Sequence, residues 1–151
     1  MTEIIKEIIS AFFGSLGFSI LFRLRHKLWF PASLGGGLAW SLYLLLFKLT
    51  GDIFTSTLFS AGFGAIYAEV LARYYRAPAT LFVIPAMVPH IPGGALYYMM
   101  SYFVQGNKLA ASTYAELVLI YATAIAAGIS IVWALWAMIR KFLLDRKIKN
   151  P

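Results

Sequence analysis

Charged residues divide this chain into long apolar runs. Five of the runs are long enough to cross about 30 Å of hydrocarbon, which takes roughly 20 residues of helix. They cover residues 4–22, 28–47, 53–72, 77–107 and 117–139. The pattern therefore predicts an all-α integral membrane protein with five transmembrane helices, in which residues 1–151 form a single transmembrane domain.

The fourth run is interrupted by residues that oppose helix. Pro85, Pro89 and Pro92 have no amide hydrogen, and Gly93 and Gly94 disfavour helix, so continuous helix is not expected across this stretch. A rise of about 1.5 Å per residue from the start of the run places the break near the middle of the bilayer. Lipid cannot satisfy the freed carbonyls, so the break needs protein or a water-filled cavity around it.

Composition supports the membrane interpretation and excludes several functions. The chain is 61% hydrophobic and 13% charged, with a mean hydropathy of +0.77, which is typical of a protein whose solvent is the lipid bilayer. Its net charge of +7 comes from residues that flank the apolar runs, so nucleic acid is not expected as a partner. The chain has no cysteine, and no metal or cofactor is expected. The mixed charges before the first run predict a retained helix and no cleavable signal.

The basic residues also predict an orientation. Only Lys6, Lys48 and Lys108 fall at one end of the predicted helices, whereas ten basic residues fall at the other. Since Lys and Arg concentrate in cytoplasmic segments, we expect the N-terminus outside and the C-terminus in the cytoplasm of a multi-pass protein of the cell membrane. The same balance predicts one net crossing for the fourth run. The ten residues are Arg23, Arg25, Lys27, Arg73, Arg76, Arg140, Lys141, Arg146, Lys147 and Lys149.

The break in the fourth run is the candidate substrate site. A helix that restarts after Pro92 would expose the amides of Gly93, Gly94 and Ala95 at a positive dipole end, which suits a carboxylate. Glycine also lets a ligand approach the backbone. From the residues alone, a proline kink that only shapes helix packing explains the break as well as a substrate site does. The candidate substrate-binding residues are Pro89, His90, Pro92, Gly93, Gly94 and Tyr97.

Two ionisable side chains are candidates for coupling or gating. His90 is the one ionisable residue near the predicted membrane centre, where it could relay a proton or bind a carboxylate. A neutral histidine bonded to a freed carbonyl is the alternative. Glu69 precedes Arg73 by four residues, so an ion pair near the cytoplasmic end is expected, with a gating carboxylate as its rival. Tyr97 could offer its hydroxyl to substrate or simply pack.

Small and aromatic residues predict how the helices associate. Glycines in the second, third and fifth runs, such as Gly36, Gly64 and Gly128, predict close helix packing. Tryptophans such as Trp29 and Trp40 are typical of interfacial belts.

Four stretches resemble the threonine/serine exporter family: Tyr67–Glu69, Arg76–Thr80, Phe82–Pro85 and Val88–Tyr97. The similarity is to the short five-helix component, which corresponds to the C-terminal half of full-length members, and it covers nearly the whole chain. The resemblance implies secondary-type export of threonine, serine or succinate-like dicarboxylates and no enzymatic activity. It also implies a longer membrane partner chain with a cytoplasmic domain, a homo-oligomer, or both.

The sequence departs from the family pattern at one site position. An apolar residue is expected in relatives where this chain has His90, which shifts the weight of the site toward the backbone of Pro92, Gly93 and Gly94. A structural or assembly subunit, whose partner binds the substrate, is the alternative function. An intramembrane enzyme is disfavoured, because the chain has two histidines, no cysteine and no HExxH or nucleophile-elbow motif.

Overall fold

The computed structural model describes the backbone of residues 2–149 and the side chains of residues 2–141. Within that range the secondary structure is entirely helical, which confirms the predicted fold class. Four helices are each long and apolar enough to cross a membrane, and α4 to α5 form a bent fifth candidate span. The elements are α1 (Thr2–Leu21), α2 (His26–Thr50), α3 (Ile53–Tyr75), α4 (Thr80–Met87), the 3-10 helix η1 (Val88–His90), α5 (Gly93–Val104) and α6 (Lys108–Lys149).

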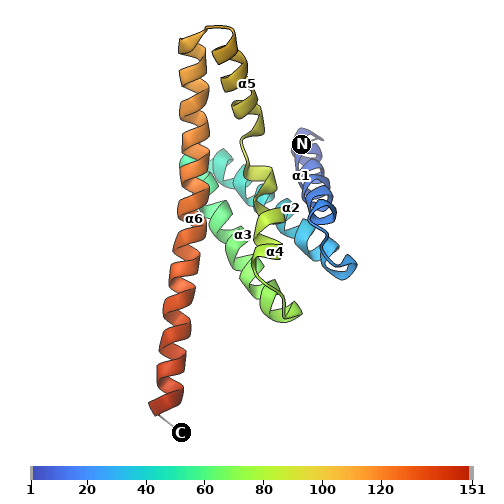
Figure 1. Cartoon of the computed structure of the whole chain (residues 1–151), viewed down its shortest axis with the longest axis vertical. Helices are drawn as coiled ribbons and strands as arrows, with labels where there is room; N and C mark the ends of the chain where they lie inside the picture. Colours follow the sequence, from blue (N-terminus) through green and yellow to red (C-terminus); the bar gives the residue numbers. More distant parts are fainter. Residues whose placement is uncertain (1, 150–151) are drawn as a thin grey trace.

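The helices form a bundle from which one pair projects. In the bundle α1 packs on α2, α2 packs on α3, and α4 lies against both α2 and α3 (Figure 1). The long helix α6 runs beside α3, and α5 packs on the first turns of α6. The α1–α2 and α3–α4 turns lie at the same end of the bundle as the C-terminal part of α6. We call this the basic end, because its turns carry Arg23, Arg25 and Arg76.

Glycine and alanine let the helix backbones approach closely. A Cβ added at Gly64 would lie 2.5 Å from the Met87 side chain of α4. One added at Gly128 would lie 2.5 Å from the Leu58 carbonyl and 3.0 Å from the Gly62 amide nitrogen. These contacts confirm that the glycines serve helix packing, the main source of association for helices in lipid.

Polar caps set where two helices begin. The Asp52 carboxylate accepts a hydrogen bond from the Thr55 amide at 2.7 Å and caps α3. Hydrogen bonds from the Thr55 side chain and backbone hold the pKa of Asp52 below its usual range. The Asn107 side chain accepts from the Ala110 amide at 3.1 Å, so α6 begins at Lys108, well before the apolar run predicted from residue 117.

The fourth span breaks where the prolines and glycines predicted. Helix α4 ends at Met87, η1 carries the chain through His90, and α5 restarts after Pro92. The two parts meet at a bend of 56°. Helix α5 continues away from the basic end and does not fold back along α4 (Figure 1).

A substitution at Gly128 tests the α3–α6 contact. We expect Gly128→Ala to destabilise the protein by about 1–3 kcal/mol, because the new methyl group meets backbone atoms of α3 that cannot turn aside. Gly17→Ala is the matched control, since a Cβ there meets nothing within 4 Å. The measurement is the thermal midpoint of monodisperse protein in detergent. Equal midpoints for the two variants would contradict the packing.

Candidate functional site

His90 is the buried centre of the break. Its side chain is 1% exposed, and its Nε2 lies 2.8 Å from the Ser60 hydroxyl oxygen of α3. The Trp40 ring meets the imidazole edge-on at a centroid distance of 5.6 Å, and the Tyr43 ring lies at 6.1 Å. Aromatic residues of α2 thus pack against the imidazole, and Ser60 of α3 holds one of its two nitrogens in place.

A small cavity lies beside His90. Its volume is about 190 Å³, below the range of roughly 300–1,000 Å³ typical of sites for drug-sized ligands, so it limits a ligand to a small molecule. The hydroxyl oxygens of Tyr43 and Tyr121 are 2.9 Å apart, which joins α2 to α6 at this level. The cavity is lined by Trp40, Pro89, His90, Ile91, Pro92, Ala95, Leu117 and Tyr121.

Three buried polar side-chain atoms of the bundle, one of them in the break, have no hydrogen-bond partner among the described residues. They are Ser15 Oγ on α1, Thr57 Oγ1 on α3 and His90 Nδ1. The nearby Ala86 carbonyl does not make a hydrogen bond of ordinary geometry with the imidazole. A buried polar atom without a partner costs about 1–3 kcal/mol, so these atoms call for water or a ligand inside the bundle.

The start of α5 presents free amides beside the same cavity. The Gly93 amide donates to the Ile91 carbonyl at 2.8 Å, which removes it from the predicted cradle. The amides of Gly94 and Ala95 find no acceptor in the part of the chain that the structure describes. Ala95 lines the cavity, whereas Gly93 and Gly94 are exposed, with open space where a Cβ would stand. The helix end therefore offers two donors and a positive dipole.

The predicted site residues separate into two groups. Pro89, His90 and Pro92 line one cavity, as the position of the break suggested. Tyr97 does not line it and is 69% exposed on α5. Glu69 lies nine residues beyond Ser60 on α3, about 14 Å of helix rise toward the basic end, so it is not part of the cavity.

The expected ion pair between Glu69 and Arg73 does not form among the described residues. The Arg73 guanidinium instead lies over the Trp136 ring, 4.0 Å from its centroid. The reason is the parallel packing of α6 on α3, which brings an aromatic face to the arginine and permits a cation–π contact.

Sequence reasoning missed four residues of the site. Ser60, Tyr43 and Tyr121 come from spans in which nothing distinguished them from other polar or aromatic residues. Trp40 was expected only in an interfacial belt, whereas the structure places it half-buried against His90. A polar or aromatic residue well inside an apolar run is the signal that could have indicated them.

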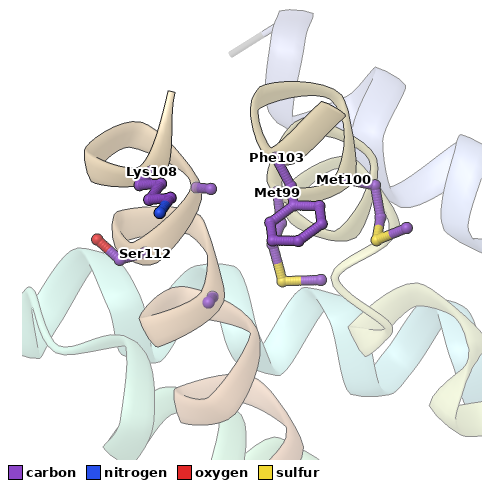
Figure 2. A pocket seen from close by; sticks show the side chains of 7 residues that line it. Met99, Met100, Phe103, Lys108 and Ser112 are labelled. Carbon is purple, nitrogen blue, oxygen red and sulfur yellow. The ribbon is translucent and has the colours of Figure 1, made fainter. Parts of the chain in front are cut away.

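A second hollow lies between α5 and α6. Its volume is about 460 Å³ and its lining is nearly all apolar, including Met99, Phe103 and Ala111. Figure 2 shows Met99 and Phe103 between α5 and the first turns of α6, which carry Lys108 and Ser112. The hollow suits an acyl chain or an apolar side chain and offers little to a carboxylate.

A double-mutant cycle tests the contact between His90 and Ser60. Ser60→Ala leaves the buried Nε2 without its partner, so we expect a loss of about 1–2 kcal/mol of stability. The double variant Ser60→Ala/His90→Leu should lose less stability than the sum of the losses in the two single variants, because it no longer has the buried Nε2 that lacks a partner. Thermal midpoints of the four proteins in detergent measure the coupling. Strict additivity would show that the two side chains do not interact.

Comparison with known proteins identifies the family. Residues 7–135 match the sequence profile of a family described as "Threonine/Serine exporter, ThrE". No curated protein and no solved structure matches the chain. The match covers most of the chain, including the broken fourth span and every residue that lines the cavity. The chain therefore belongs to the threonine/serine exporter family, a family of membrane transporters.

Proposed function

We propose that this chain is a subunit of a secondary-type exporter that moves threonine, serine or a small dicarboxylate out of the cytoplasm. The observation that supports it most is the cavity at the broken span, where His90 Nδ1 and the amides of Gly94 and Ala95 have no hydrogen-bond partner among the described residues. A bilayer penalises such groups unless something polar occupies the site. A transported solute with a carboxylate fits that requirement.

Each group beside the cavity has a distinct role in the proposal. The amides of Gly94 and Ala95 receive the substrate carboxylate at the positive end of α5. His90, oriented through Nε2 by Ser60, keeps Nδ1 for a hydroxyl or carboxylate of the solute. Tyr121 can offer its hydroxyl from the facing wall. Glu69 lies toward the basic end, where it could gate access without touching the bound solute.

A membrane partner chain belongs to the proposal. Helix α5 has no buried residue and packs mainly on α6, and Gly93 and Gly94 are exposed. Irregular backbone at this depth needs protein or water around it, and lipid supplies neither. We infer that a longer partner, or a second copy of this chain, covers α5 and closes the site. The basic end faces the cytoplasm in this arrangement, with the N-terminus outside.

Substitution of the exposed glycine tests the substrate site. We expect Gly94→Leu to reduce efflux of threonine or succinate by tenfold or more, because the side chain occupies the approach to the α5 amides. A Cβ at Gly94 meets nothing within 4 Å, so the fold should tolerate the change. Gly14→Leu is the matched control, since it also enters open space. Efflux is measured in cells with membrane levels of each protein matched; normal efflux by Gly94→Leu would refute the site.

The alternative is a structural subunit whose partner alone binds the substrate, and the exposure of α5 favours it equally. A photoreactive substrate analogue, applied to the purified complex, distinguishes the two. We expect label in the peptide that contains Pro89–Ala95, competed by excess unlabelled substrate. Label confined to the partner would establish the structural role.

A further inference from the structure

A second polar cavity lies at the basic end, away from the transport site. It has a volume of about 450 Å³ and lies between the α1–α2 turn and the α3–α4 turn. No acidic residue lines it, and the ion pair found among the described residues, Lys6 with Glu3, is in α1 far along the chain from either turn. Four cationic side chains contribute to the lining: Arg23, Arg25, Lys27 and Arg76.

Two helices begin at this cavity and add positive potential. Arg25 is the N-cap of α2 and Ala79 that of α4, and neither first turn is capped by a side chain. Lys27 and Leu28 of α2 and Leu81 of α4 line the cavity. The positive ends of both helix dipoles therefore reinforce the side-chain charges.

The backbone is strained where it supplies two of the four cations. Arg23 and Arg76 have φ values of 54° and 51°, and they are the non-glycine residues with positive φ in the described chain. Glycine or asparagine adopts this conformation more readily than arginine. Both turns thus place a long cation, at some conformational cost, beside the same cavity.

The general excess of basic residues in cytoplasmic segments explains why these charges are positive. It does not explain why four of them, from two separate turns, line the same cavity. The cavity also has an apolar floor, formed by the buried side chains of Leu24 and Leu28. A cationic rim above an apolar floor, at the end of the membrane spans, fits a headgroup whose acyl chains enter the bilayer.

We propose that this cavity binds an oxyanion, and that its source is the phosphate of an anionic phospholipid. A soluble phosphate or dicarboxylate presents the same chemistry and is distinguished by the test. The proposal is independent of the transport function, because the cavity shares no lining residue with the site at His90.

The test titrates the purified full chain in uncharged detergent with short-chain phosphatidylglycerol, phosphatidylcholine, inorganic phosphate or succinate. We expect phosphatidylglycerol to raise the thermal midpoint saturably by about 5 °C or more, and phosphatidylcholine to have no saturable effect. The variant Arg23→Gln/Arg76→Gln should bind at least tenfold more weakly. Lys6→Gln/Lys48→Gln removes the same net charge elsewhere and should bind like the wild type.

Each result of the test bears on the proposal. Saturable stabilisation by phosphate or succinate, but not by phosphatidylglycerol, would show that the cavity binds an oxyanion and that its ligand is a soluble anion, not a phospholipid. No saturable response to any anion, or equal weakening in the two double variants, would overturn the proposal. If Arg23→Gln/Arg76→Gln elutes as aggregate, Arg25→Gln/Lys27→Gln decides the question by the same titration, because it removes two rim cations without changing a residue of positive φ.

Discussion

Lipid offers no hydrogen-bond partner to a polypeptide backbone, and the rest of this structure depends on how that constraint is met between Val88 and Gly94. Helix α4, which precedes the break, lies against α2 and α3, and η1 within the break lies against α1 and α2, so protein encloses them on that side. Small residues allow α4 to lie close to α3: the Met87 side chain packs against Gly64, and Ala86 is fully buried. On its other side the break opens toward α5, which has no buried residue, and Leu117 and Tyr121 of α6 line the cavity there.

The same close packing gives the cavity its chemistry. Because α3 packs closely on α4 through small residues such as Gly64, the Ser60 hydroxyl of α3 lies within hydrogen-bond distance of the His90 imidazole that follows α4. The hydrogen bond between Tyr43 and Tyr121 then links α2 to α6 along the cavity wall. The histidine is held by one nitrogen, Nε2, and its Nδ1 is buried without a hydrogen-bond partner among the described residues.

The charged side chains and the cavity beside His90 lie in different parts of the protein. Cations collect at the basic end, where Arg23 and Arg76 border a surface cavity, while the cavity beside His90 has no permanent charge in its lining. Neutral donors cost less to bury than ions, so a site built from amides, a hydroxyl and an imidazole can lie deep in the protein. A carboxylate would reach that site from a positively charged surface in the proposed orientation.

The sequence by itself determined the all-helical membrane fold, the break in the fourth apolar run and the family, because each follows from residue types in linear order. It also identified Pro89, His90 and Pro92 as cavity residues, since a break must be enclosed wherever it falls. Only the tertiary structure decided which residues of the other helices face that break, including Trp40 and Ser60, and that Arg73 pairs with Trp136. Helices in lipid are apolar on every side, so their sequences give little indication of which face packs against the other helices.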